Sequence, residues 1–260
     1  MADSIILETK SLRREFGALV AVDNVSLQVE AGSLHSIIGP NGAGKTTFFN
    51  LLSGNIPPTS GKVLLRGKDI TNVPLYKTVH LGIGRSFQIT NIFPNLTVLE
   101  NIRLAAQALG KDSFRLFRSH RAFTKYEARA WEVIEQVGLM NEALLPARTL
   151  PHGAQRKLEL GMILSPDPEI LLLDEPTAGM ASEQVPELMA LIQKIQAKGN
   201  KTVMLVEHNM NVVMTVSDKI TVMHHGSVLA EGTPAEISAD ETVQTAYLGH
   251  LYEDSAASPQ

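Results

Sequence analysis

A glycine-rich run that ends in a lysine and two threonines is the first candidate for chemistry in this chain. The segment Gly39–Thr47 has the sequence G-P-N-G-A-G-K-T-T and fits the pattern G-x-x-x-x-G-K-[ST]. Its glycines let successive backbone N–H groups point inward toward phosphate oxygens at a helix N-terminus. Lys45 would reach the β- and γ-phosphates, and the hydroxyl of Thr46 would ligate Mg²⁺. The run therefore predicts a site for a nucleoside triphosphate with Mg²⁺, formed by Gly39, Asn41, Gly42, Ala43, Gly44, Lys45, Thr46 and Thr47.

A pair of carboxylates after an apolar run is the second candidate. Asp174 and Glu175 directly follow Ile170–Leu173. Asp174 fits an anchor that holds Mg²⁺ through a coordinated water, because the ion needs an anionic group opposite the phosphates. The backbone must turn at Glu175, so that its carboxylate can face the γ-phosphate and polarise an attacking water as a general base. Alone, the pair would be better explained as an acidic turn; together with the glycine-rich run, it predicts hydrolysis of the nucleotide.

The segments around these residues have the patterns needed to position them. An apolar strand is predicted at Leu34–Ile38 before the glycine-rich run, and an amphipathic helix at Thr46–Leu52 after it. Ile170–Leu173 and Val203–Val206 have the continuous apolar pattern of strands buried in a parallel sheet. A strand, a loop and a helix in this order are the context that a phosphate-binding loop requires.

The remaining segments predict two further kinds of structure. Val25–Val29 alternates like a half-buried antiparallel strand, and Val63–Leu65 lies between glycines like one strand of a hairpin. From about Leu96 to Leu164 the pattern is helical. Within it, the basic and aromatic insertion Lys111–Lys125 is compatible with a nucleic-acid patch, but an exposed helix with a few packed Phe rings is the favoured interpretation.

Composition excludes several classes of protein. The chain has 260 residues, enough for one large α/β domain with an insertion, and a formal net charge of −4 that argues against a nucleic-acid partner. It has no Cys, which excludes thiolate catalysis and Cys-based metal sites. No apolar run approaches the length of a membrane span, and the N-terminus lacks the pattern of a signal peptide. We therefore expect a cytoplasmic location.

Taken in order, these motifs resemble those of ABC-type ATPases, the nucleotide-binding subunits of ATP-driven transporters. Asp174–Gly179 resembles the Walker B and D-loop region, and Val206–His208 ends a strand as the switch-His segment does. Phe87-Gln88 resembles the Q-loop, whose Gln contacts Mg²⁺ and senses the membrane partner. Phe16-Gly17 resembles the A-loop, whose aromatic ring stacks on adenine, and Leu150–Gln155 takes the place of the signature motif. The resemblance covers nearly the whole chain, from about Ile5 to Gly249.

The resemblance also implies roles for individual residues. His208 would contact the γ-phosphate and the attacking water, so that the catalytic set is Glu175, His208, Lys45 and Gln88, and the Mg²⁺ ligands are Thr46, Gln88 and Asp174. Phe16 would bind the adenine. A lone His at the end of a strand is usually structural, but the carboxyl edge of a parallel sheet is where ligands bind.

The signature segment departs from the family's most common form, Leu-Ser-Gly-Gly-Gln. Pro151 replaces the Ser and supplies neither a hydroxyl nor an N–H group, while His152 stands at the first Gly and Ala154 at the Gln. Gly153 is kept, and a helix predicted at Gln155–Leu164 can still direct its N-terminal dipole at a phosphate. By resemblance, His152, Gly153 and Gln155 would bind the ATP held by the P-loop of a second, identical or homologous ATPase subunit in a head-to-tail dimer. The D-loop also departs from the family, with Met180 and Ala181 in place of the more usual Leu and Asp.

The type of transporter is a finer question. Gly82–Gln88, Asn91–Asn101 and the ending Ala246–Gly249 resemble the ATPases of branched-chain amino-acid uptake systems. The alternative is the urea and short-chain amide importer branch, which His152-Gly153, Gly161-Met162 and Gly179-Met180 suggest. The ATPase would work on the cytoplasmic face of the cell membrane with permease subunits, and only indirectly with a solute-binding protein.

ABC-type ATPases also have functions outside transport. ABC-type ATPases of DNA repair and chromosome organisation need long coiled-coil arms, and this chain has no sustained heptads. Those that act on ribosomes carry two ATPase domains, and this chain has one P-loop. A nucleotide-binding regulator without turnover is an alternative, although it would not need the carboxylate of Glu175.

We therefore expect an α/β fold: a P-loop NTPase core of the ABC-ATPase type with an antiparallel β-subdomain and an inserted helical subdomain. Residues of about 1–90 and 165–250 would form the nucleotide-binding core with its β-subdomain, about 91–164 the helical subdomain, and 251–260 a disordered tail. Within the helical subdomain, the apolar stretch after Gln88 has more apolar residues than a free loop needs. We expect Ile92 and Phe93 to help line a groove for a short permease helix; the alternative is that the whole stretch packs inside the subdomain.

Overall fold

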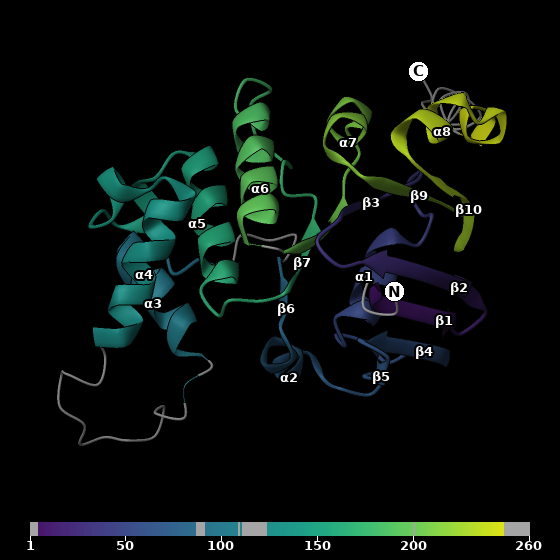
Figure 1. Ribbon diagram of the computed structural model, residues 1–260, viewed down its shortest axis with the longest axis horizontal. Coiled ribbons are helices and arrows are strands. Elements are labelled where there is room, and N and C mark those ends of the chain that lie inside the picture. The colour runs from purple at the N-terminus through teal and green to yellow at the C-terminus, as the bar shows by residue number, and fades with distance from the viewer. Residues whose placement is uncertain (1–4, 87–91, 109, 111–123, 200, 247–260) are drawn as a thin grey trace. The chain divides into compact units, whose positions relative to one another are not determined.

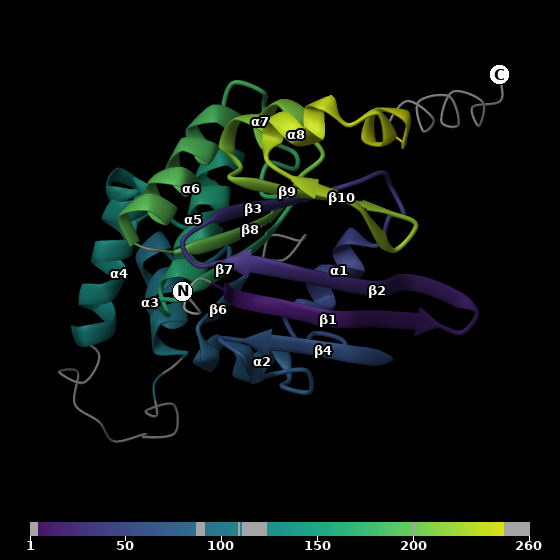
Figure 2. The ribbon, with the colours of Figure 1, turned by 45° about the vertical axis from the view of Figure 1, so that its right-hand side comes forward.

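The computed structural model describes residues 5–86, 92–108, 110, 124–199 and 201–246. The first element of the fold is a long antiparallel hairpin. Its strands, β1 (Ile5–Phe16) and β2 (Leu19–Glu30), are joined by a two-residue turn. β4 (Ser60–Leu65) pairs with the other side of β1, and β5 (Lys68–Asp69) pairs with β4, so the sheet order is β2-β1-β4-β5. Figure 2 shows β2, β1 and β4 side by side. The predicted antiparallel strand at Val25–Val29 and the hairpin strand at Val63–Leu65 are confirmed.

The chain divides into two compact units, of which the first is made of two separate stretches of sequence and the second of one. The first contains residues up to Leu75 and those from Thr202 onward, and the second contains Tyr76–Lys201. In the first unit, β3 (Leu34–Ile38) lies between β8 (Thr202–Val206) and β9 (Lys219–His224) and is parallel to both. β10 (Ser227–Gly232) pairs with β9 in the antiparallel direction. β3 and β8 are buried at every position, as their continuous apolar patterns predict.

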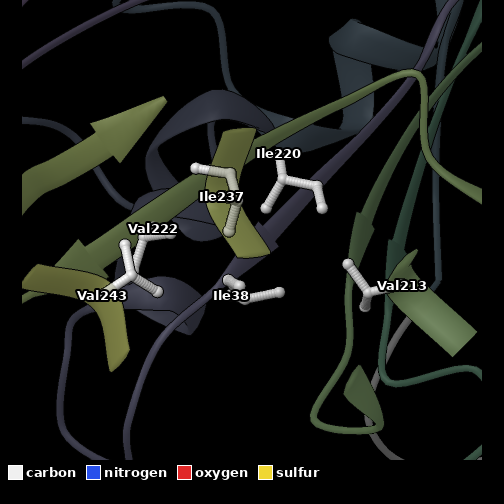
Figure 3. Close-up of a cluster of buried hydrophobic side chains, with 6 residues drawn as sticks. All are labelled: Ile38, Val213, Ile220, Val222, Ile237 and Val243. Carbon is white, nitrogen blue, oxygen red and sulfur yellow. The ribbon is translucent and has the colours of Figure 1, made fainter. Parts of the chain in front are cut away.

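The helices of the first unit are α1 (Lys45–Leu52), α7 (Met210–Val216) and α8 (Pro234–Ala239). α8 begins with a complete capping box, because the Thr233 hydroxyl accepts from the Glu236 N–H and the Glu236 carboxylate accepts from the Thr233 N–H. A cluster of aliphatic side chains packs α7 and α8 against β3 and β9 (Figure 3). Burying one such side chain contributes about 1.5–3 kcal/mol. The six residues of the cluster are Ile38, Val213, Ile220, Val222, Ile237 and Val243.

The second unit is mainly helical (Figure 1). Its elements, in chain order, are α2 (Leu75–Thr78, at the boundary), the 3₁₀ turn η1 (Val79–Leu81), β6 (Ile83–Arg85), α3 (Val98–Gln107), α4 (Thr124–Val137), the 3₁₀ turns η3 (Met140–Glu142) and η4 (Ala147–Thr149), α5 (His152–Leu164), β7 (Ile170–Asp174) and α6 (Val185–Gly199). β6 and β7 pair in parallel. The predicted helical pattern from about Leu96 to Leu164 is confirmed where the chain is described.

Close packing in the second unit depends on a glycine of α5. A Cβ atom at Gly161 would lie 3.0 Å from Ile102 Cδ1 of α3 and 3.4 Å from Val133 Cγ1 of α4. The missing side chain therefore lets α5 approach both helices, and α5 is the helix that carries the signature segment at its start. No helix among the described residues is long and apolar enough to cross a membrane.

Candidate functional site

The glycine-rich loop joins β3 to α1 with a backbone that only glycine adopts easily. Gly39, Gly42 and Gly44 all have positive φ angles, of 151°, 78° and 97°. A Cβ atom at Gly39 would overlap the carbonyl oxygen of Met223, and one at Gly44 would overlap that of Ala21. The loop therefore curls tightly against neighbouring backbone, and Gly39 and Gly44 cannot be replaced without displacing that backbone.

Lys45 is the first residue of α1, and its side chain turns back over the loop. Its Nζ atom is buried and donates hydrogen bonds to the carbonyl oxygens of Gly39 (2.6 Å) and Pro40 (2.9 Å). The helix start has no side-chain cap and no acidic residue in its first turn. A helix N-terminus of this kind, with an ammonium group above it, suits a phosphate group.

The other loop residues differ in exposure. Asn41 and Gly42 are exposed, Ala43 is buried, and Thr46 and Thr47 are half-buried. Ala43 accepts a hydrogen bond from the N–H of Gly226 (3.1 Å) at the β9–β10 turn, which fixes the loop from behind. The predicted helix after the loop is confirmed and begins one residue earlier, at Lys45.

His208 follows β8, the neighbour of β3. The two strands are parallel, with Ile37 opposite Val206, so that the glycine-rich loop and His208 emerge at the same edge of the sheet. His208 is exposed, and its N–H donates to Oε2 of the buried Glu207 (3.3 Å). Within the first unit, the structure thus brings together two of the sequence-predicted elements at the carboxyl edge where ligands bind in parallel sheets.

Phe16 lies at the end of β1, at the tip of the first hairpin. It is 46% exposed, which is unusual for a Phe side chain. The guanidinium carbon of Arg14 lies 4.6 Å from the centre of its ring, so one face of the ring has a cation–π partner. The exposed aromatic surface has the properties expected of a stacking platform for a base.

In the second unit, Asp174 ends β7 with its carboxylate buried. Its N–H donates to the hydroxyl of Ser86 (2.8 Å), and Nη2 of the buried Arg85 lies 4.0 Å from its Oδ2. Burial lowers the pKa of Arg85, and the charge of Asp174 opposes that shift. Glu175 follows with a φ of 49°, a left-handed conformation that is uncommon outside glycine. The backbone therefore turns sharply at Glu175, which confirms the turn predicted from the sequence.

The signature segment begins α5, and the predicted start of that helix was wrong by three residues. α5 spans His152–Leu164, with Pro151 as its N-cap, instead of beginning at Gln155. Proline is tolerated there because the N-cap N–H makes no intrahelical bond. Gly153 is buried, His152 is exposed, and the Gln155 amide donates to the Leu150 carbonyl (3.0 Å), which ties the helix to the preceding residue.

The predicted residues fit a phosphate group better than a metal centre made of protein ligands alone. Among the described residues, no group of three or more His, Asp or Glu side chains could hold a metal ion. The Thr46 hydroxyl and the Asp174 carboxylate are oxygen donors of the kind that Mg²⁺ prefers. Gln88 lies outside the described residues, as do residues 111–123 of the basic insertion and the 251–260 tail.

Two residues near these motifs were not singled out from the sequence. Arg85 is a buried cation beside Asp174, and Arg156 joins α5 to the segment after β7. Both partners lie far away in sequence, so a local pattern gives little indication of either contact. The only sequence feature that points to Arg85 is its position within the Gly82–Gln88 stretch, which resembles a segment of a known family.

Comparison with known proteins gives a consistent result. Residues 22–178 match the family model described as ABC transporter, and residues 227–252 match that of the branched-chain amino acid ATP-binding cassette transporter. The chain is 42% identical to the high-affinity branched-chain amino acid transport ATP-binding protein BraF of Pseudomonas aeruginosa, over 94% of this chain and 98% of BraF. It is 39% identical to LivG of Escherichia coli K12, which has the same description, with the same coverage.

Solved structures agree with the sequence matches. The ADP conformation of MJ1267, an ATP-binding cassette of an ABC transporter, superposes with a TM-score of 0.81 at 29% identity, over 94% of this chain and 99% of that one. A dimeric post-hydrolysis state of the cassette MJ0796, bound to ADP and Pi, gives a TM-score of 0.74 at 28% identity, over 88% and 99%. The predicted α/β fold of the P-loop type is confirmed by this agreement.

Proposed function

Because the chain belongs to the ABC transporter family of ATP-binding proteins, we propose that it is the ATP-hydrolysing subunit that energises uptake of branched-chain or related amino acids. The observation that carries the proposal is the glycine-rich loop with its buried Lys45, at the same sheet edge as His208. The names of the relatives that match over 94% of the chain support the amino-acid substrate.

The predicted site residues would each have a separate role in ATP hydrolysis. The loop N–H groups and Lys45 bind the β- and γ-phosphates, and the exposed ring of Phe16 stacks on adenine. The Thr46 hydroxyl, Gln88 and Asp174 hold Mg²⁺, which, when bound, neutralises charge on the phosphates. Glu175 takes a proton from the attacking water as the general base, and His208 orients that water at the γ-phosphate.

The proposal includes a head-to-tail dimer with an identical or homologous subunit. The start of α5, with His152, Gly153 and Gln155, would face the ATP held by the partner's loop. The dimeric structures of the cassette MJ0796 support the formation of a dimer. Residues of about 91–164 would form a helical subdomain, and about 1–90 and 165–250 the nucleotide-binding core.

An exposed apolar surface on the second unit is proposed as the contact with the membrane permease. Phe93 is 51% exposed and Leu144 is 69% exposed, and Leu145 beside it is also exposed. Backbone hydrogen bonds from Val98 N to Leu145 O and from Ala147 N to Leu96 O join the two segments that carry these side chains. Exposed apolar residues on adjoining segments commonly mark an interaction site. The subunit would then work at the cytoplasmic face of the membrane, and the solute-binding protein would act on it only through the permease.

Two alternatives lead to different measurements. A urea or short-chain amide importer would share the site but respond to another solute, and a regulator without turnover would bind ATP without hydrolysing it. The names of the relatives favour the amino-acid importer, and the carboxylate of Glu175 favours hydrolysis.

Reconstitution of the complete transporter tests the proposal. The chain would be co-purified with its permease and solute-binding protein, and ATP hydrolysis would be measured with leucine, isoleucine, valine, urea or acetamide added singly. We expect stimulation by the branched-chain amino acids. Stimulation by urea or acetamide alone would support the amide importer, and ATP binding without hydrolysis under every condition would support the regulator.

A further inference from the structure

An arginine with a largely covered side chain joins the helix of the signature segment to the segment that follows Glu175. The side chain of Arg156, on the second turn of α5, is only 10% exposed. Its Nη1 donates to Oε2 of Glu159 on the same helix (2.7 Å), and its Nη2 donates to the carbonyl oxygen of Ala178 (3.0 Å). The two ends of one guanidinium group therefore hold two different parts of the second unit.

A second hydrogen bond continues this connection to the backbone of Glu175. The N–H of Ala178 donates to the carbonyl oxygen of Glu175 (3.0 Å). Ala178 is thus held on both sides, by Glu175 through its N–H and by Arg156 through its carbonyl group. Two hydrogen bonds therefore join α5 to Glu175, whose left-handed φ of 49° forms the turn after β7.

Close packing reinforces the contact between the two segments. A Cβ atom at Gly179 would lie 3.3 Å from Cε1 of His152, and one at Gly153 would lie 3.0 Å from Oε1 of Gln184. Each glycine therefore lies beside a side chain of the other segment, and a larger residue at either position would have to displace the His152 ring or the Gln184 amide.

We propose that Arg156 is a positioning residue that makes the start of α5 and the turn at Glu175 move as one body. This inference rests on the proposed function, in which α5 faces the ATP of the partner subunit and Glu175 acts on the ATP of its own. Arg156 would then couple the two ATP sites of a dimer: engagement of α5 with the partner's nucleotide would fix the backbone of Glu175. In this role the guanidinium group would act through the backbone of Ala178 and Glu175.

The planar shape of the arginine side chain is essential to this role. The guanidinium group presents donors in fixed directions, so that one group can bind a carboxylate and a carbonyl oxygen that lie on different sides. A lysine would keep the charge beside the buried Glu159 but presents its donors from a single nitrogen atom. Arg156→Lys should therefore keep the ion pair with Glu159 and weaken the hydrogen bond to Ala178. The variant thus tests the connection to Ala178 separately from the effect of the positive charge.

ATP-driven dimerisation of the full chain tests the proposal. In the hydrolysis-deficient Glu175→Gln background, the ATP concentration for half-maximal dimer formation would be measured by analytical ultracentrifugation. Binding of a fluorescent ATP analogue would be measured separately at protein concentrations at which the chain is monomeric. We expect Arg156→Lys to raise the half-maximal ATP concentration by about tenfold, the size of a typical coupling contact, with monomer binding unchanged within about twofold.

Two further variants keep the result interpretable. Glu159→Gln disturbs the same buried pair but leaves Arg156 bound to Ala178, so it should dimerise like the parent. Lys157→Met removes the neighbouring contact of α5 with Glu187 on α6 (2.6 Å) and should also have no effect. Unchanged dimerisation of Arg156→Lys, or equal impairment by Glu159→Gln, would overturn the positioning role. If the parent itself neither binds ATP nor dimerises, the proposed function fails instead.

Discussion

Mild acid is expected to destabilise the first unit through a single buried histidine. His35 lies on β3, the strand that leads into the glycine-rich loop, and is completely buried. Its Nε2 lies 2.7 Å from Oγ1 of Thr221, whose hydroxyl donates to Glu231 (3.0 Å). The Thr221 hydroxyl therefore accepts from Nε2–H, which leaves the proton-free Nδ1 buried, with no hydrogen-bond partner in the described part of the chain. Protonation of Nδ1 would place a charged N–H group in a site without an acceptor.

The size of the effect follows from the pKa of His35. Burial lowers this pKa to about 4, with Glu231 opposing the shift and Lys219 adding to it. The unfolded chain has the ordinary value of about 6.5, so between these values the unfolded state binds more protons and stability falls as pH falls. Between pH 7 and pH 5, the two pKa values give a loss of about 2 kcal/mol in the free energy of unfolding.

Urea unfolding at pH 7 and pH 5 measures this loss, followed by circular dichroism. The variant His35→Gln can still donate to Thr221 but does not titrate, so its stability should change with pH by about 2 kcal/mol less than that of the wild type. The matched control is His80→Gln, because His80 is exposed, and this variant should keep the full pH dependence. An equal pH dependence in the wild type and in His35→Gln would refute the reasoning.

Three further predictions address the nucleotide site and the apolar surface. Glu175→Gln should still bind ATP with Mg²⁺ but hydrolyse it about 10²–10⁴-fold more slowly, the usual effect of losing a general base; near-normal turnover in a phosphate-release assay would exclude that role. Lys45→Ala should weaken binding of a fluorescent ATP analogue strongly, because it removes the buried cation of the loop, whereas Phe16→Ala should cost roughly 1–3 kcal/mol; indifference to Lys45→Ala would contradict the phosphate-loop assignment. Phe93→Asp should leave the chain folded and able to bind ATP but reduce transport by the assembled complex, since the side chain is half exposed; unfolding of the isolated chain would make Phe93 a core residue, and normal transport would place the permease contact elsewhere.

The features that could be predicted from sequence are those with a local cause. The loop between β3 and α1 follows from its glycines and the apolar strand before it, and the turn at Glu175 follows from a strand that ends in polar residues. The predicted start of α5 at Gln155 is three residues too late, because the helix already begins after Pro151, where proline at the N-cap costs it no hydrogen bond.

The features that could not be predicted depend on residues distant in sequence. His35 was not singled out because a buried histidine in an apolar strand becomes informative only when Thr221 and Glu231 are seen beside it. Arg156 has the pattern of an ordinary helical residue, and its bond to Ala178 crosses from one element to another. In both cases the chemistry depends on tertiary contacts that no pattern in the neighbouring sequence encodes.

The order in which the strands appear in the chain has a consequence for synthesis on the ribosome. β3 leaves the ribosome early, but both of its sheet neighbours, β8 and β9, come after the whole of the second unit. The pairs Leu34–Val203 and His35–Lys219 cannot form until that intervening segment has been made, and such distant pairings fold slowly. Tyr76–Lys201 has no such requirement for its β6–β7 pair, so we expect the second unit to acquire protection from protease before the nucleotide-binding loop does. Ribosome-bound chains that end before Thr202 should therefore bind no ATP, even though the entire Gly39–Thr47 loop has already been translated.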